Sequence, residues 1–262
     1  MASVAASVQE VLPPLFDSTC LEPPPLFDGT TRLYVFYECP FCQRVWIVRN
    51  FKGLQDQIKL VGIELADKPA WYKEKVYPPN KLPSLEHNGK IIGESMDLIR
   101  YVDTNFQGPS LLPDDHEKLK FADEMIAYMD TFTKNVFTSF KGDPVKAAGA
   151  EFDYLEVALA KFEDGPFFLG QFSQVDAAFV PFIERFQIYL KEVFKYDIIP
   201  GRPRLAVYIE ELNKIDAYKQ TKCDPNWLIQ FYNKQFMLNS GADILQQVDV
   251  SCVVRDHMSG IA

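Results

Sequence analysis

Two cysteines separated by two residues are the strongest chemical signal in this chain of 262 residues. They lie in Cys39-Pro40-Phe41-Cys42-Gln43-Arg44, between an apolar run that predicts a strand and a helical pattern. A sulfur at that junction faces the unpaired N–H groups of the first helical turn and the positive end of the helix dipole. Both favour thiolate over thiol, so we expect a lowered thiol pKa. Cys39 precedes the helix, is expected to be the exposed sulfur of the two and is the predicted nucleophile, whereas Cys42 falls within the first turn.

Two other interpretations of the cysteine pair stay open. A zinc site needs four ligands, and the remaining candidate ligands form no second pair: Cys20, Cys223, Cys252, His87, His116 and His257. The pair could also be buried and purely structural. Its position after the first strand of a thioredoxin-like unit favours the reactive interpretation, and we expect no metal.

A proline directly before a predicted strand is the second chemical feature. Pro83 cannot donate a hydrogen bond to a sheet, and the Leu82-Pro83 bond is a candidate for the cis form. A cis bend would leave the N–H and C=O of Leu82 free to pair with an extended peptide, as an added strand does. An ordinary trans proline at the strand entry is the alternative.

Glu94 and Ser95 lie between a predicted hairpin and a predicted helix. Ser95 is a candidate cap for that helix, and its hydroxyl with the first N–H groups would form an anion pocket. Glu94 can face an ammonium group, so the two residues together fit the end of an amino acid. Lys68 and Lys81 offer charge to a second ligand carboxylate. A small peptide with an amino-acid end, a thiol and another carboxylate fits this set, and glutathione has that layout.

The elements around these residues follow the order of a thioredoxin-like unit. The patterns predict a strand, a helix, a strand, a short helix, an Asn-Gly hairpin and a helix, over residues 33–37, 45–51, 58–65, 69–76, 84–92 and 96–106. This β-α-β-α-β-β-α order joins a parallel pair by a right-handed crossover and adds an antiparallel hairpin. We therefore predict an α/β thioredoxin-like domain over residues 31–107.

The rest of the chain predicts an all-α domain over residues 114–237. Helical patterns cover 115–140, 144–162, 175–194, 203–215 and 225–236, with a capping box at Ser173 and Asp176. Residues 238–262 lack helical periodicity and are expected to form a loosely attached tail. Residues 1–30 form a proline-rich arm in which Pro-Pro-Leu-Phe-Asp occurs twice. The repeat could be recognised by a partner; packing of Phe16 and Phe27 onto the body is favoured.

Charge and composition exclude several classes of function. The net charge of −9 would repel nucleic acid, and the chain has no long cluster of Lys and Arg. No apolar run approaches the roughly 18 residues that span a bilayer, so no membrane partner is expected. Residues 1–31 lack the basic residues of a secretory or transit peptide, and five cysteines argue against a disulfide framework. We expect a cytoplasmic protein.

Several segments resemble the lambda-class glutathione transferases of plants. They are residues 39–47, Lys68-Pro69-Ala70-Trp71-Tyr72, residues 81–89, Gly93-Glu94-Ser95 and residues 164–171. The similarity runs from about residue 33 to residue 236. It implies a thioredoxin-like domain followed by a helical domain, with Cys39 as nucleophile in place of the Ser or Tyr of conjugating classes.

The resemblance also implies site residues and an activity. The implied glutathione contacts are Cys39, Lys68, Leu82, Glu94 and Ser95, and we include the adjoining Pro40, Phe41, Lys81 and Pro83. Enzymes of this class act as thioltransferases and remove glutathione from conjugates, including those of flavonols. The class usually has a small residue where this chain has Cys42, which makes Cys42 a candidate resolving thiol. The residues beyond Leu238 also exceed what the class leads us to expect.

We therefore expect a thioltransferase that reduces or deglutathionylates small-molecule conjugates through a mixed disulfide between Cys39 and glutathione. The expected partners are glutathione and small aromatic or flavonoid-type conjugates, and a monomer is favoured. One alternative is a membrane-associating protein, because chloride intracellular channel proteins resemble the cysteine motif; the charged Glu38, Arg44 and Arg49 argue against it. The other is a non-catalytic flavonoid carrier that uses aromatic residues of the helical domain, around Tyr128, Phe132 and Trp227.

Overall fold

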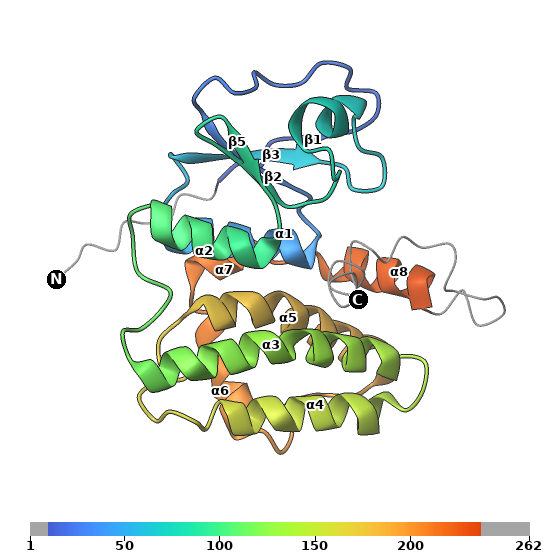
Figure 1. Ribbon diagram of the computed structural model, residues 1–262. Coiled ribbons are helices and arrows are strands. Elements are labelled where there is room, and N and C mark those ends of the chain that lie inside the picture. The colour runs from blue at the N-terminus through green and yellow to red at the C-terminus, as the bar shows by residue number, and fades with distance from the viewer. Residues whose placement is uncertain (1–9, 237–262) are drawn as a thin grey trace, which may run out of the picture. The chain divides into compact units, whose positions relative to one another are not determined.

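The structure is a computed structural model that describes residues 10–236. The chain forms two compact units (Figure 1). Among the described residues, the first unit comprises 10–109 together with Leu212–Lys222, and the second comprises Ser110–Glu211 together with 223–236. The predicted tail, residues 238–262, lies outside the described residues, and so do residues 1–9 of the predicted arm.

The first unit is built on a five-stranded sheet in the order β1-β3-β2-β4-β5. The strands are β1 (Leu15–Phe16), β2 (Thr31–Val35), β3 (Ile58–Ile63), β4 (Ser84–His87) and β5 (Lys90–Ile92). β1, β3 and β2 are parallel, whereas β4 and β5 are antiparallel to their neighbours. Every residue of β2 is buried, as expected for a central strand covered on both faces. The predicted thioredoxin-like pattern is confirmed.

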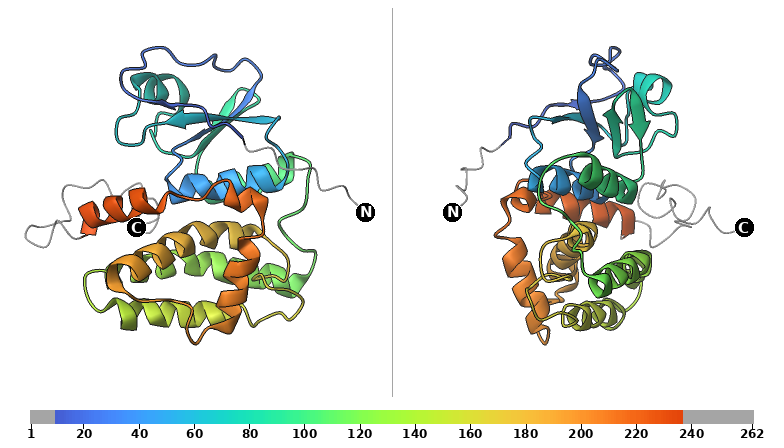
Figure 2. Two further views of the ribbon diagram at one scale, coloured as in Figure 1. Left: turned by 180° about the vertical axis from the view of Figure 1, so that it is seen from behind. Right: turned by 60° about the vertical axis from the view of Figure 1, so that its left-hand side comes forward.

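Helices cover this sheet. α1 (Pro40–Phe51) and α2 (Ser95–Asn105) pack against each other and lie side by side (Figures 1 and 2). α1 ends where Gly53 adopts a φ of +69°, a conformation that favours glycine. The short helix predicted over 69–76 is present as a π-helix, η1 (Tyr72–Val76). α7 (Asp216–Lys219), which the sequence did not predict, packs on α1 and so belongs to the first unit.

The N-terminal segment is part of the first unit rather than a separate arm. The first copy of the repeat supplies β1, which pairs with β3, and the Tyr37 hydroxyl donates to Pro13 O at 2.7 Å. Phe16 packs edge-on against Trp71, with ring centroids 5.6 Å apart. Packing was thus predicted correctly for Phe16 and wrongly for Phe27, whose side chain is 45% exposed. Phe27 adopts a φ of +53° at a bend in the chain.

Two buried charged side chains anchor this segment. The Arg49 guanidinium is fully buried and donates to both carboxylate oxygens of Glu10, at 2.6 and 2.7 Å. Glu86, on β4, accepts from the Phe27 N–H and from the Tyr34 hydroxyl, each at 2.7 Å. Burial, and then the adjacent Glu86 carboxylate, raise the pKa of Tyr34. The segment is therefore attached at both ends by charge-assisted hydrogen bonds.

The second unit is helical. Its helices are α3 (His116–Ser139), α4 (Pro144–Ala158), α5 (Gln174–Phe194), α6 (Pro203–Leu212) and α8 (Pro225–Phe236). α5 is buried along most of its length and packs against α3 and α8. The fully buried Phe132 of α3 meets Phe152, Phe179 and Phe186 with ring centroids between 5.5 and 5.7 Å apart. The five predicted helices are confirmed, although those predicted to end at 162 and 215 end earlier.

The predicted capping box begins α5. The Ser173 hydroxyl accepts from the Val175 N–H, and Asp176 Oδ2 accepts from the Ser173 N–H and hydroxyl at 2.8 and 2.7 Å. Asp176 Oδ1 accepts from the Phe168 N–H at 3.3 Å. Asp176 is fully buried, and burial raises its pKa to about 7, although these hydrogen bonds lower it.

Replacing Asp176 by alanine should lower the free energy of unfolding by about 3 kcal/mol, because a cap and buried donors lose their acceptor. The pKa of this carboxyl is raised above its ordinary value of 3.8, so the folded state binds the proton more tightly. Its contribution to stability is therefore complete below about pH 4 and is lost as the pH rises to about 7. Asp176→Asn should flatten that part of the stability profile, measured by denaturant unfolding at successive pH values. Asp143→Ala, at the exposed cap of α4, is the matched control; an unchanged slope in Asp176→Asn would contradict the assignment.

Candidate active site

Cys39 lies where the sequence predicted, at the junction of β2 and α1. It is the N-cap residue of α1, with φ −80° and ψ 124°. Its N–H donates to Phe36 O at 3.1 Å, and its C=O accepts from the Gln43 N–H at 2.9 Å. Cys39 is 4% exposed, so the prediction of an exposed cysteine at this position is wrong. The Cys39 sulfur is therefore held next to the first turn of a twelve-residue helix, where the dipole favours negative charge.

Cys42 differs from Cys39 in its surroundings. It is fully buried, and its sulfur accepts a hydrogen bond from the Phe36 N–H at 3.4 Å. Both cysteines are free thiols in the structure. Cys42 thus supports the turn that carries Cys39, because Phe36 also accepts from the Cys39 N–H.

The Leu82-Pro83 peptide bond is cis, which confirms the prediction. Leu82 is 5% exposed. Within residues 10–236, neither its N–H nor its C=O has a hydrogen-bond partner. Buried main-chain groups are rarely left unpaired, so these two groups are suited to pair with an extended ligand.

Tyr72 holds the chain on both sides of this bend, and sequence analysis missed it. Its hydroxyl donates to Lys81 O at 2.7 Å and lies 2.8 Å from Ser84 Oγ. Tyr72 is fully buried. The sequence feature that could have revealed Tyr72 is its place in the motif from Lys68 to Tyr72, since a buried tyrosine needs a partner for its hydroxyl.

Ser95 does not cap α2, and that prediction is wrong. Glu94 is the N-cap residue, with φ +63°, and no side chain caps the helix. Ser95 is the first helical residue, and its hydroxyl instead accepts from Arg44 Nη1 at 3.1 Å. The Glu94 carboxylate lies 3.8 Å from Lys81 Nζ, and both side chains are about 40% exposed. Such an exposed pair is weak and can open for a ligand.

Lys68 and Phe41 also belong to the predicted set of site residues. Lys68 is half-buried and has no ion-pair partner within the described part of the chain. Phe41 is half-buried and lies under the Arg44 guanidinium, 5.1 Å from ring centroid to Cζ.

Gly93 has no room for a side chain, because the Tyr77 hydroxyl occupies the place of a Cβ. Tyr77 therefore fixes the turn before Glu94, a role that depends on a contact invisible in the sequence.

The sheet brings the predicted residues to one end. Tyr34 of β2 lies opposite Ser84 of β4, so the carboxyl end of β2 meets the amino end of β4. Cys39 follows the first strand and Leu82 precedes the second. β5 is antiparallel to β4, so its carboxyl end, which leads to Glu94, lies at that same end of the sheet. β3 is parallel to β2 and leads towards Lys68.

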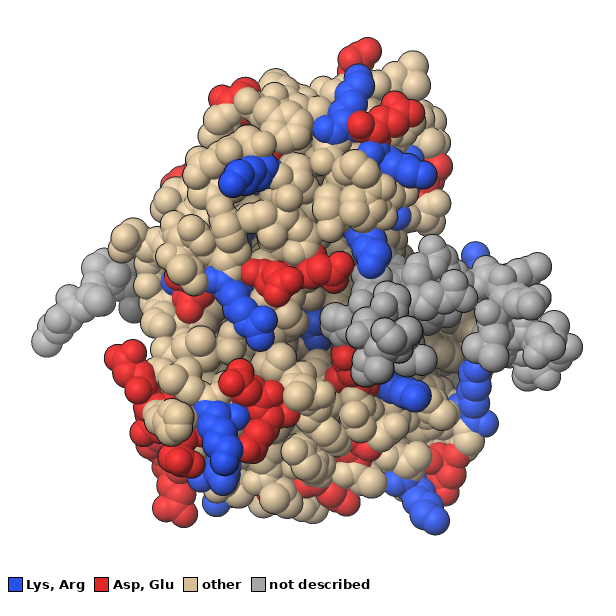
Figure 3. All heavy atoms as spheres, in the orientation of Figure 1, with Lys and Arg blue, Asp and Glu red and all other residues tan. Residues whose placement is uncertain are grey.

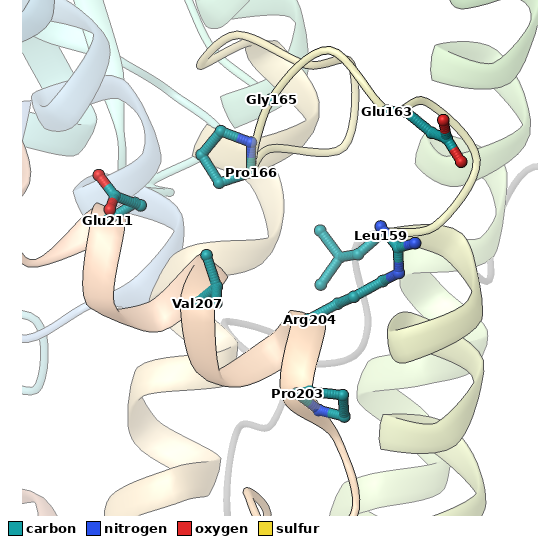
Figure 4. Close-up of a pocket in the computed structure, with 8 residues that line it drawn as sticks. All are labelled: Leu159, Glu163, Gly165, Pro166, Pro203, Arg204, Val207 and Glu211. Carbon is teal, nitrogen blue, oxygen red and sulfur yellow. The ribbon is translucent and has the colours of Figure 1, made fainter.

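A hollow of about 550 Å³ lies in the second unit (Figure 4). Its lining is Leu159, Glu163, Gly165, Pro166, Pro203, Arg204, Val207 and Glu211. The set contains no cysteine, serine or histidine, so it offers no nucleophile for thiol chemistry.

The aromatic residues suggested for a flavonoid carrier are not a common surface. Phe132 is fully buried, the Tyr128 hydroxyl donates to Glu151, and Trp227 stacks on Phe231 with centroids 4.8 Å apart. Figure 3 shows acidic and basic side chains interspersed on the visible face, without a continuous basic stripe for nucleic acid. None of the helices in residues 10–236 has the length and apolar character needed to cross a membrane. Within the same residues, no cluster of three potential metal ligands is found.

Two family models match the chain. The model described as the N-terminal domain of glutathione S-transferase matches residues 33–110, and the model of its C-terminal domain matches residues 145–211. Glutathione S-transferase L3 of Arabidopsis thaliana is 62% identical over 216 residues, which are 82% of this chain and 92% of the relative. Glutathione S-transferase L1 of the same plant is 63% identical over 217 residues, covering 82% and 91%.

Solved structures agree with the sequence comparisons. Rice GST1 in complex with glutathione superposes with a TM-score of 0.65 at 26% identity, over 78% of this chain and 97% of the rice chain. The match confirms the predicted order of a thioredoxin-like unit and a helical unit.

Replacing Tyr72 by phenylalanine should loosen the bend at Leu82 without removing the ring. The free energy of unfolding should fall by about 1–2 kcal/mol, because Lys81 O and Ser84 Oγ lose their partner. Binding of glutathione, measured by calorimetry, should weaken several-fold. Tyr208→Phe is the matched control, because Tyr208 is equally buried but lies on α6 in the second unit. Equal effects of the two changes would contradict a role for the Tyr72 hydroxyl in the site.

Proposed function

Because the chain belongs to the lambda class of the glutathione transferase family, we propose that it is a thioltransferase with Cys39 as its nucleophile. Glutathione is the co-substrate. The observation that carries the proposal is a buried sulfur at the amino end of α1, at the same end of the sheet as unpaired main-chain groups of Leu82. A thiolate and a peptide-binding bend are the two parts that thiol exchange with a tripeptide needs.

Each part of glutathione has a proposed contact. The cysteinyl main chain pairs with the N–H and C=O of Leu82, beside Pro83. The γ-glutamyl end binds with its ammonium at Glu94 and its carboxylate at Ser95 and the first N–H groups of α2. Lys68 faces the glycyl carboxylate, since it has no other ion pair among the described residues. Lys81 adjoins Glu94, and Pro40 and Phe41 line the wall next to the sulfur.

The proposed cycle begins when the Cys39 thiolate attacks the glutathionyl sulfur of a mixed disulfide. A new sulfur–sulfur bond joins Cys39 to glutathione, the old one breaks, and the released thiolate takes a proton. The thiolate of a second glutathione then attacks the glutathionyl sulfur on Cys39. Glutathione disulfide leaves and Cys39 returns as thiolate.

A thioether conjugate follows the same route. Cys39 attacks the glutathionyl sulfur, the carbon–sulfur bond breaks, and its electron pair stays on the organic fragment, which takes a proton. The fragment is thereby reduced by two electrons, and the second glutathione supplies them as the disulfide forms. We propose small aromatic or flavonoid-type conjugates as the acceptors.

Glutathione, rather than Cys42, resolves the intermediate in this cycle. The Cys42 sulfur is fully buried and already accepts from the Phe36 N–H. Attack by Cys42 would require it to leave that hydrogen bond and approach from inside the fold.

We also propose a cellular compartment and an oligomeric state for the protein. Cys20, Cys39, Cys42 and Cys223 are free thiols, which suits a reducing cytoplasm. We propose that the chain works there as a monomer, because every proposed glutathione contact comes from the first unit of one chain. Imaging of a fluorescent fusion and light scattering of the purified chain test these two points.

Cys39→Ser should reduce glutathione-dependent turnover of a mixed disulfide by at least about a hundredfold, because serine is not ionised at neutral pH. Cys42→Ser should keep activity within about twofold, since a hydroxyl also accepts from an N–H. The assay follows glutathione disulfide production with glutathione reductase and NADPH. Cys20→Ser, a thiol of the N-terminal segment, is the control.

Full activity in Cys39→Ser would refute the assigned nucleophile. Equal losses in Cys39→Ser and Cys42→Ser would instead indicate a cycle through an internal disulfide.

A further inference from the structure

A buried arginine that the proposed cycle does not use lies directly behind the proposed carboxylate pocket. Arg44 is on α1, is 3% exposed, and donates from Nη1 to Ser95 Oγ at 3.1 Å. We propose that Arg44 is a positioning residue for the γ-glutamyl carboxylate of glutathione and that it acts through Ser95. The inference rests on the proposed function, because it assumes glutathione as the ligand.

The contact fixes the direction of the Ser95 hydroxyl. A serine hydroxyl has one proton to donate and two lone pairs to accept with, whereas a guanidinium can only donate. Arg44 therefore occupies a lone pair of Ser95 Oγ. Within residues 10–236, the Ser95 proton has no acceptor. The Ser95 hydroxyl is thus oriented to donate a hydrogen bond. A carboxylate oxygen of the bound ligand is the acceptor for that bond.

Charge supports the same role. A guanidinium stays protonated at any pH the protein meets, and a buried charge is little screened by salt. Its field adds to that of the free N–H groups at the start of α2. Glu94, the preceding residue, carries the opposite charge. The two neighbouring positions thus match the carboxylate and the ammonium of one amino-acid end.

Arg44 also connects the sulfur site and the γ-glutamyl pocket through one helix. Cys39 caps α1, and Arg44 extends from the second turn of α1 to α2. The Arg44 guanidinium lies over the Phe41 ring, and this cation–π contact helps to hold it in place. The contact between Arg44 and Ser95 therefore links the helix that carries Cys39 at its amino end to the first residue of α2.

The test measures binding rather than turnover. Calorimetry compares S-methylglutathione, whose blocked sulfur cannot form a disulfide, with an analogue whose γ-glutamyl α-carboxylate is replaced by hydrogen. Wild type should prefer S-methylglutathione. Arg44→Met should bind it about tenfold more weakly and should bind the analogue almost as wild type does. Arg44→Lys, which keeps the charge but not the planar fork, should recover part of the preference.

Arg49→Met is the matched control. Arg49 is equally buried on α1 but donates to Glu10 and to Ile58 O. Its loss should lower stability and leave the preference between the two ligands unchanged. An equal loss for both ligands in Arg44→Met would show that Arg44 only supports the fold, and would overturn the inference.

A second pair of variants keeps the test decisive if Arg44→Met does not fold. Ser95→Ala should lose the preference for S-methylglutathione, and adding Arg44→Lys to it should change nothing further, because both act on one contact. Additive losses would overturn the inference. Wild type that fails to bind S-methylglutathione at all would contradict the proposed function itself, whereas normal binding with unchanged Arg44 variants contradicts only this inference.

Discussion

The antiparallel pairing of β4 with β2 is the constraint on which the candidate site depends. With Tyr34 opposite Ser84, the turn that leaves β2 and the bend that enters β4 lie at one end of the sheet. The hairpin then returns β5 to that end. Each reactive or binding group lies within a few residues of a hydrogen-bonded strand, and groups near rigid elements keep their positions better than groups on long loops. The chemistry thus depends on strand register more than on any single side chain.

The strand register places the site residues approximately, and buried polar contacts then fix their positions. The Tyr72 hydroxyl spans the cis bend, the Cys42 sulfur accepts from the turn before Cys39, and Arg44 joins α1 to α2. None of these groups has to touch a substrate to matter. A loosely held sulfur would lose the alignment with the helix dipole that favours its thiolate form. Stability and reactivity therefore share the same few hydrogen bonds.

Local sequence patterns predicted most of the fold because turns and helix caps depend on interactions between residues that are close in sequence. The hairpin follows from the left-handed turn at Asn88 and Gly89, and α5 begins at a capping box written in four consecutive residues. Tertiary contacts explain the element that the sequence did not predict and the prediction that was wrong. β1 is two residues long and has no periodicity to detect, and Ser95 is not a cap because Arg44, 51 residues earlier, determines its partner. A pairing across that separation leaves no pattern in one sequence.

Mapping of the mixed disulfide tests the central claim most directly. The native protein is treated with glutathione disulfide, its intact mass is measured, and the modified peptide is identified without reduction. A single glutathione on Cys39, with Cys42 unmodified, is the result that follows from the geometry at the amino end of α1. Modification at Cys20 with Cys39 untouched, or an internal bond between Cys39 and Cys42 with no bound glutathione, would contradict it.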